Sequence, residues 1–130
     1  MNWKFAGDRP VYQQIMENIR GSILRGELPP GGKIPSVRDL AAQAQVNPNT
    51  MQRAMTELER DGLVYSQRTA GRFVTEDKAM IERVKLDLAE SHIQSFLAAM
   101  LRLGYDKEEI VSLLRQETGK EETLDGGSGM

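Results

Sequence analysis

The sequence predicts a mostly α-helical fold that contains one small β-hairpin. Three observations lead to this prediction. Apolar residues recur at helical spacing in five segments of the 130-residue chain. Two short runs rich in β-branched and aromatic residues stand close together between the third and fourth of these segments. Serine, asparagine, aspartate, proline and glycine stand where helices of this length would begin and end.

The composition excludes several classes of protein. The chain has no cysteine, which rules out a disulfide framework, a thiolate metal site and a thiol nucleophile. Its opening, MNWKFAGDRP, lacks the apolar core of a signal peptide, and no stretch approaches the roughly 20 apolar residues of a membrane helix. We therefore expect a cytoplasmic protein with no membrane partner. Residues 1–75 carry ten Lys/Arg against seven Asp/Glu, and residues 76–130 carry seven against twelve, which suits a front half that contacts phosphate.

The first helix is expected from Pro10 to Arg25. Proline suits the first helical turn because its missing N–H costs nothing there. An apolar stripe repeats every four residues along this segment, at Val11, Ile15, Ile19 and Ile23. Gly26 is placed to end the helix in a left-handed conformation, and a loop rich in proline and glycine follows from Leu28 to Pro35.

Two helices joined by a tight turn come next. Ser36 and Asp39 form a variant of the capping box, which predicts that the second helix begins at Ser36. The turn at residues 45–46 leads to a third helix with Asn47 as its N-cap and an end near Arg60. One face of this third helix should pack on the first two through Met51, Ala54, Met55 and Leu58.

A β-hairpin is expected after the third helix. The runs Leu63–Ser66 and Arg72–Thr75 are β-prone, and the residues between them form a flexible basic tip. The order helix, helix, helix, hairpin is that of a winged helix-turn-helix, which we assign to residues 1–76.

The back half is expected to form a helical dimerisation element at residues 77–118. A helix from about Asp77 to Leu103 would extend about 40 Å, and a short helix capped by Asp106 and Glu109 would follow it. The apolar face of the long helix is too wide for that short helix to cover. We therefore expect a homodimer held by Ile81, Val84, Leu88, Ile93, Phe96, Leu97, Met100 and Leu101. The alternative is a helix that folds back on its own winged domain.

The end of the chain is polar and glycine-rich. We expect a disordered tail at residues 119–130. The GGSG sequence within it has the composition of an expression linker.

The exposed face of the third helix is that of a helix that enters the major groove of DNA. Asn47, Asn49 and Thr50 lie at its N-terminus, where free backbone amides and the helix dipole favour a phosphate. In helix-turn-helix docking the first part of this helix reaches the base edges. Arg53 can address guanine, and Gln52 or Asn49 can address adenine. The competing interpretation is an ordinary amphipathic helix with a solvated face.

Two further places carry the same prediction. Arg38 lies in the first turn of the second helix and can bind a phosphate or a base bidentately. Its alternative is a surface ion pair with Asp39 or Glu57. The hairpin tip is small and cationic, and we expect it to contact DNA through Arg68, Thr69, Gly71 and Arg72.

These segments closely resemble the GntR family of bacterial transcriptional regulators. The resemblance is carried by PVYQQIMENIRGSILRGELPPGGKIPSVRDLA and by VNPNTMQRAMTELERDGLV, within about Pro10 to Val74. The short tail of two helices is similar to the YtrA-type subfamily. The resemblance implies a homodimeric regulator, usually a repressor, that binds a palindromic operator in double-stranded DNA. It implies DNA contact by Ser36, Arg38, Asn47, Asn49, Thr50 and Gly71. Two residues depart from the family pattern: glycine is common where Gln45 stands, and a basic residue is common where Gln52 stands.

Other functions have weaker support in the sequence. No nucleophile–base pair, phosphate-cradling glycine loop or metal cluster is present, so we expect no enzyme activity, no cofactor and no bound metal, with His92 as the only histidine. A winged-helix module for a protein partner is the alternative, favoured by the methionine-rich helices and opposed by the cationic side chains. A small-molecule effector, if the protein binds one, is expected between subunits around Phe96, Met100 and Tyr105.

Overall fold

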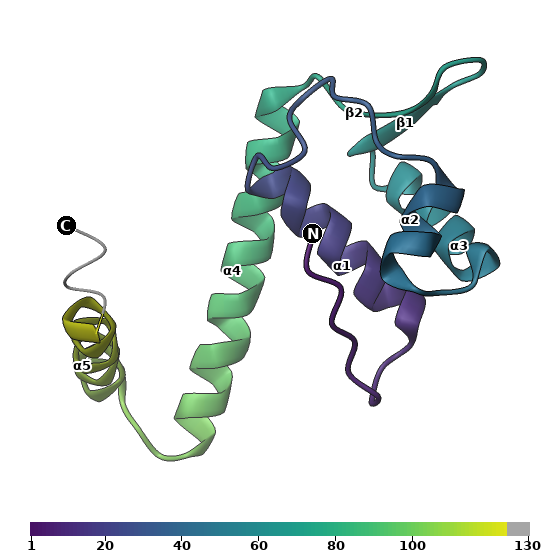
Figure 1. The fold of residues 1–130 in the computed structure, drawn as a ribbon. Helices are drawn as coiled ribbons and strands as arrows, with labels where there is room; N and C mark the ends of the chain where they lie inside the picture. Colours follow the sequence, from purple (N-terminus) through teal and green to yellow (C-terminus); the bar gives the residue numbers. More distant parts are fainter. Residues whose placement is uncertain (125–130) are drawn as a thin grey trace. The chain divides into compact units, whose positions relative to one another are not determined.

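The structure is a computed structural model that describes residues 1–124 (Figure 1). The chain divides into two compact units, residues 1–85 and the residues from 86 onward. The described elements follow in the order α1 (Val11–Leu24), α2 (Val37–Ala44), α3 (Pro48–Arg60), β1 (Val64–Gln67), β2 (Gly71–Val74), α4 (Lys78–Arg102) and α5 (Lys107–Leu124). The chain is therefore mostly helical with one antiparallel hairpin, as predicted. None of the helices in residues 1–124 combines the length and the apolar character that crossing a membrane requires.

The helix ends follow the capping residues of the sequence. The hydroxyl of Ser36 accepts a hydrogen bond from the Asp39 amide at 3.1 Å, and α2 begins at the next residue. The side-chain oxygen of Asn47 accepts from the Asn49 amide at 2.8 Å at the start of α3. Gly26 has a φ of +83°, which is the left-handed conformation expected after α1.

The turn between α2 and α3 contains a left-handed residue that is not glycine. Gln45 has φ 56° and ψ 47°, and it is the only non-glycine residue with positive φ in the described part of the chain. A side chain in this conformation costs about 1–2 kcal/mol. The turn is completed by a hydrogen bond of 3.0 Å from the Val46 amide to the Ala41 carbonyl. This left-handed geometry is one that glycine adopts without strain, which fits the glycine that is common at this position in the family that the sequence resembles.

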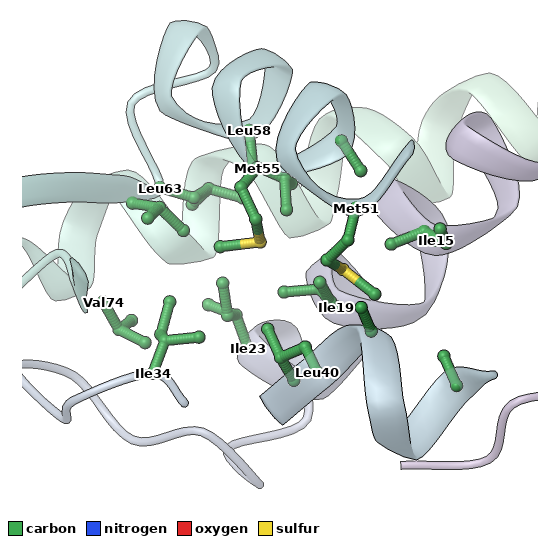
Figure 2. Close-up of a cluster of buried hydrophobic side chains, with 14 of the residues drawn as sticks. Ile15, Ile19, Ile23, Ile34, Leu40, Met51, Met55, Leu58, Leu63 and Val74 are labelled. Carbon is green, nitrogen blue, oxygen red and sulfur yellow. The ribbon is translucent and has the colours of Figure 1, made fainter. Parts of the chain in front are cut away.

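One hydrophobic core joins the elements of the first unit (Figure 2). Figure 2 shows three isoleucines of α1 facing the methionines and leucine of α3. Ile15, Ile19 and Ile23 come from α1 and are at most 2% exposed. The remaining large buried side chains close the core around them: Leu40, Met51, Met55, Leu58, Leu63, Val74 and Ile34. The predicted α3 face is buried, and so are three of the four residues of the predicted α1 stripe, whereas Val11 at the start of α1 is 39% exposed.

The hairpin gains a third backbone segment that the sequence analysis treated as loop. β1 and β2 are antiparallel, with Val64 opposite Val74. Compared with the expected strands, β1 begins and ends one residue later and β2 one residue earlier. Lys33 forms an isolated antiparallel bridge with Phe73, and the Ile34 amide donates to the Arg72 carbonyl at 2.9 Å. The segment before α2 therefore lies along the outer side of β2 and fixes the base of the wing.

The residues before α1 are fastened to it by a buried glutamine. The side-chain oxygen of Gln14 accepts from the Ala6 amide at 2.6 Å, and its nitrogen donates to the carbonyls of Ala6 and Arg9 at 2.8 and 2.9 Å. Trp3 and Phe5 pack against the core beside this connection. A polar residue on the helix stripe is therefore used to hold the N-terminal segment.

The second half of the chain is helical. The Met80 amide donates to the Asp77 carboxylate at 3.0 Å at the start of α4. Asp106 and Glu109 form the reciprocal capping box predicted for α5, with bonds of 3.0 and 2.9 Å.

The helix α5 is longer than the short helix we expected. It runs to Leu124, past the expected start of the tail at residue 119. The Thr118 hydroxyl donates to the Leu114 carbonyl, and Lys120 pairs with Glu117 at 3.2 Å, so local contacts support the added turn. Residues 125–130, with the GGSG sequence, lie outside the described part of the chain.

Candidate nucleic-acid interface

The exposed face of α3 carries short polar side chains and arginines. Its opposite face is buried in the core of the first unit. Asn49, Gln52, Arg53 and Thr56 are all exposed. The Gln52 amide donates to the Thr56 hydroxyl at 3.3 Å, one turn further along the same helix. The helix therefore presents hydrogen-bonding groups outward while its position is fixed from behind.

The N-terminus of α3 leaves a backbone donor available. First-turn amides of a helix have no acceptor within the helix. Pro48 contributes no N–H, and Asn47 satisfies the amide of Asn49. Among the described residues, the Thr50 amide has no hydrogen-bond acceptor. A phosphate oxygen would satisfy that donor and would also gain from the positive end of the helix dipole.

Arg53 is stacked on an aromatic ring of another helix. Its guanidinium carbon lies 3.8 Å from the centroid of the Tyr12 ring of α1. Arg53 is exposed and Tyr12 is half-buried. Tyr12 was not among the residues that the sequence analysis selected. No local sequence pattern indicates this contact, because it joins residues that are 41 positions apart in the chain.

The arginines of the winged unit divide into two groups by their partners. Residues 1–76 contain eight arginines. Five of them form ion pairs with carboxylates: Arg9–Glu17, Arg20–Asp61, Arg25–Glu27, Arg60–Glu57 and Arg72–Glu59. Within residues 1–124, Arg38, Arg53 and Arg68 are the arginines of this unit without a carboxylate partner. All three were selected from the sequence as DNA contacts.

Arg72, which was predicted to contact DNA, forms an ion pair within the protein. Its Nε donates to the Glu59 carboxylate at 2.7 Å, and the Ser66 hydroxyl donates to the same oxygen. Arg72 and Glu59 are 21% and 29% exposed. The hydrogen bond from Ser66, together with Arg72, holds the pKa of Glu59 below its usual value against the opposing effect of partial burial. Arg72 therefore ties the wing to the end of α3, an arrangement set by tertiary packing.

A shallow groove lies between the wing and the start of α2. It has a volume of about 260 Å³ and is lined by Lys33, Ser36, Gly71 and Arg72 with their neighbours. Gly71 has a φ of +104°, and a Cβ built there would lie 3.4 Å from Cε of Lys33. Lys33 has no ion-pair partner in the described residues, and it was missed in the sequence because its segment was taken for a loop.

The other predicted contacts lie at the start of α2 and at the hairpin tip. Ser36 caps α2, and Arg38 extends from the first turn of that helix into solvent. The alternative pairing of Arg38 with Asp39 or Glu57 is not formed in the described structure, where Glu57 pairs with Arg60 at 3.2 Å. Arg68 and Thr69 are exposed at the hairpin tip, where the Ala70 amide donates to the Gln67 carbonyl at 3.1 Å.

The apolar residues of α4 occupy two different sides of the helix. Ile81 is 6% exposed and belongs to the core of the first unit, with Val84 packed against it. Ile93, Phe96 and Leu101 are 55%, 38% and 50% exposed. At about 100° per residue, these later positions are displaced around the helix from Ile81 and Val84 by about 120° on average. The expected dimerisation set therefore contains residues packed on the core of the first unit and residues that face solvent. The remaining members of the set are half-buried: Leu88, Leu97 and Met100.

Metal binding has no structural support in the described residues. No group of three or more His, Cys, Asp or Glu side chains in residues 1–124 is arranged to hold an ion. His92 is exposed on α4.

Comparison with known proteins places these features in a family. Residues 11–74 match the family described as bacterial regulatory proteins, gntR family. Two relatives come from Bacillus subtilis (strain 168). The HTH-type transcriptional regulator YhcF is 38% identical over 118 residues, which cover 91% of this chain and 98% of YhcF. The HTH-type transcriptional repressor YtrA is 30% identical over 108 residues, which cover 82% of this chain and 83% of YtrA.

Solved structures have the same fold. A GntR family transcriptional regulator from Listeria monocytogenes has a TM-score of 0.84 and 38% identity, covering 86% of this chain and 98% of that one. AraR(DBD), solved in complex with operator ORX1, has a TM-score of 0.53 and 32% identity, covering 58% of this chain and 96% of that one.

Proposed function

The chain belongs to the GntR family of bacterial regulatory proteins, and from this premise we propose that it is a homodimeric repressor of a palindromic operator in double-stranded DNA. Its relatives are transcriptional regulators, a class without enzyme activity. The repressor YtrA supports the sign of regulation, and AraR(DBD) with its operator supports duplex DNA as the ligand. A dimer of such domains reads two half-sites about one helical turn apart, which accounts for the two-fold symmetry of the operator.

The observation that most supports DNA binding is the position of the arginines that have no carboxylate partner. Arg53 lies on the outer face of α3, Arg38 at the start of α2 and Arg68 at the hairpin tip. We assign base reading to Arg53, because a guanidinium can donate two hydrogen bonds to guanine O6 and N7. We assign phosphate contacts to Arg38 and Arg68, whose pairing with DNA breaks no ion pair in the protein.

The other polar residues of this surface complete the proposed interface. Asn49 and Gln52 can read adenine from the exposed face of α3. We assign a phosphate contact to Asn47 and Thr50 at the N-terminus of that helix. Ser36 and Gly71 line the groove beside the wing, and Lys33 adds a cation there that was not predicted from the sequence. Thr69 is exposed at the hairpin tip, next in the chain to the residues that line the groove.

The homodimer is supported by exposed apolar residues on the second part of α4. Ile93, Phe96 and Leu101 are apolar side chains at least 38% exposed. A second chain would remove this surface from water at a gain of about 25 cal/mol for each Å² of apolar area. We assign the interface to Ile93, Phe96, Leu97, Met100 and Leu101, and any small-molecule effector to the groove that these residues would form with Tyr105.

The operator is tested by selecting bound sequences from a random duplex pool at physiological salt with competitor DNA. The proposal expects a two-fold-symmetric motif with half-sites about one helical turn apart. Salt-sensitive binding without a motif would contradict sequence-specific regulation. No binding would favour the module for a protein partner.

The dimer is tested by a charge placed on the exposed apolar side of α4. Phe96→Glu in the full chain should shift the protein from dimer to monomer in sedimentation velocity, because the carboxylate would be buried without a partner. Ser95→Glu is the matched control, since Ser95 is exposed and its side chain lies about 100° around the helix from that of Phe96, away from the exposed apolar residues. Equal behaviour of the two variants would contradict the assigned interface.

A further inference from the structure

Two side chains from different helices form a stacked pair at the centre of the proposed reading surface. Arg53 belongs to α3 and Tyr12 to the first turn of α1. The guanidinium carbon lies 3.8 Å from the ring centroid, well within the distance of a cation–π contact. Neither residue takes part in an ion pair in the described structure.

The stack engages the face of the guanidinium and leaves its edge available. A guanidinium is planar, and its five N–H donors point outward in that plane. A distance of 3.8 Å from the guanidinium carbon to the ring centroid is that of two planar groups in stacking contact, so we infer that the ring covers one face of the guanidinium. No hydrogen bond from the Arg53 side chain to another described residue is formed, so its donors remain available to an outside acceptor. Stacking on Tyr12 and bidentate bonding to a base are therefore compatible at the same time.

The Tyr12 ring is held more firmly by its surroundings than the Arg53 side chain that stacks on it. Tyr12 is half-buried and packs against the hydrophobic core of the first unit. Its helix is held on α3 by Ile15 and Ile19, which are fully buried. An exposed arginine otherwise has many rotamers, and fixing them on binding costs free energy. A ring held by the core restricts those rotamers before DNA arrives.

We propose that Tyr12 is a positioning residue that holds the Arg53 guanidinium in the plane needed to read one base pair, so that Tyr12 sets how strongly the protein prefers that base. This inference rests on the proposed function. It adds a residue of α1, outside the two helices of the helix-turn-helix, to the determinants of sequence preference. The neighbouring Gln52 is held differently, since its partner Thr56 lies on its own helix.

The expected effect follows from the strength of an exposed cation–π contact. Such a contact corresponds to about a two- to fivefold change in an equilibrium constant. Loss of the ring should lower affinity for the preferred operator by about this factor. Binding to random duplex depends on phosphate contacts and should change less. The ratio of the two affinities should therefore fall.

The experiment uses the full chain and three substitutions: Tyr12→Phe, Tyr12→Leu and Arg53→Ala. The affinity of Arg53→Ala is first measured for operators that each have one base pair replaced. The base pair that Arg53 reads is the one whose replacement lowers the affinity of the unmodified protein but not that of Arg53→Ala. The preference at that base pair is then measured for each Tyr12 variant by competition binding. Tyr12→Phe keeps the ring and should behave as the unmodified protein. Tyr12→Leu should lose about two- to fivefold of the preference, and should lose nothing further when combined with Arg53→Ala.

A measurement without DNA tests the stack itself. In the free protein, the ring current of Tyr12 should shift the side-chain Nε–H resonance of Arg53, and Tyr12→Leu should remove that shift. Thermal unfolding of each variant checks that the winged unit remains folded.

Several outcomes would overturn the inference. One is an unchanged preference in Tyr12→Leu. Another is an equal loss in Tyr12→Phe, which would assign the effect to the hydroxyl. A third is an equal loss from Tyr12→Leu in the Arg53→Ala background, which would make it a general effect on the fold. Failure of the proposed function is distinguishable, because the unmodified protein would then show no base preference while the Arg53 resonance still reports the stack.

Discussion

The contact between the wing and α3 predicts a specific loss of stability in Glu59→Gln. Glu59 accepts hydrogen bonds from Arg72 and from the Ser66 hydroxyl. Glutamine keeps the size of the side chain and an acceptor for Ser66 but removes the charge. Arg72 is only 21% exposed, so it would be left partly desolvated without its carboxylate. A hydrogen bond between charged groups contributes about 1.5–3 kcal/mol when buried and less than about 1 kcal/mol at the surface. For this half-buried pair we expect a loss of about 1–2 kcal/mol in the free energy of unfolding.

The assay is urea denaturation at two pH values. The pKa of Glu59 is lowered in the folded protein, so its contribution is fully present above the unfolded-state pKa of about 4.3. That contribution is lost as the pH falls through the lower folded-state value. The difference between the unmodified protein and Glu59→Gln should therefore be largest near neutral pH. It should shrink progressively below about pH 4.

A carboxylate on the same helix provides the control. Glu57 pairs with Arg60 at 3.2 Å, and the Arg60 side chain is 73% exposed. Glu57→Gln should cost about 0.5 kcal/mol or less, because exposed i,i+3 pairs are weak. Two results would refute the reasoning: a cost for Glu59→Gln no larger than for Glu57→Gln, or a cost that stays the same at acid pH.

Three further predictions concern the core, the turn and the phosphate contacts. Ile19→Ala should lower the free energy of unfolding by about 2–5 kcal/mol in urea titrations, since Ile19 is 0% exposed at the centre of the core; a loss below 1 kcal/mol would contradict this. Gln45→Gly should raise the thermal midpoint, because glycine relieves about 1 kcal/mol at a φ of 56°, and a lower midpoint would mean that the Gln45 side chain contributes contacts of its own. Arg38→Ala should reduce the slope of log affinity against log salt by about one, whereas Arg25→Ala, whose guanidinium pairs with Glu27, should leave it unchanged. Equal slopes for these two variants would remove Arg38 from the phosphate contacts.

The features that the sequence predicted correctly depend on neighbouring residues. Ser36 and Asn47 cap their helices through amides two or three positions away. Asp106 and Glu109 cap α5 through each other, and Gly26 ends α1 through its own backbone freedom. The stripe of α1 was visible because helical periodicity directly reflects which face is buried.

The features that the sequence analysis missed join residues far apart in the chain. Lys33 bridges to Phe73, Arg72 pairs with Glu59, and Arg53 stacks on Tyr12. Nothing in the local pattern around an arginine tells whether a carboxylate or a ring will lie beside it after folding. The sequence could therefore nominate arginines for DNA contact, but tertiary packing decides which of them are free to make it.

The sequence also could not show that the apolar residues of α4 lie on two different sides of the helix. Apolar residues recur along its whole length, and counting them gives a single wide face. In the structure the face changes sides, since Ile81 completes the core of the winged unit while Phe96 is exposed later along the helix. The change falls near residue 85, where the two compact units meet along the chain.

The net charge and the ion pairs of the winged unit lead to the same expectation, weak binding to DNA of random sequence. The chain carries −2 overall, which argues against strong attraction to any polyanion. Most arginines of the winged unit add little to such attraction because a carboxylate already neutralises each of them. Arg38, Arg53 and Arg68 remain, and two of these are assigned to phosphates. Few phosphate contacts give weak binding to random sequence and a shallow salt dependence for one domain. Base contacts and a second domain would both add to the affinity for a defined site, so this argument supports the proposed dimer without depending on strong phosphate binding.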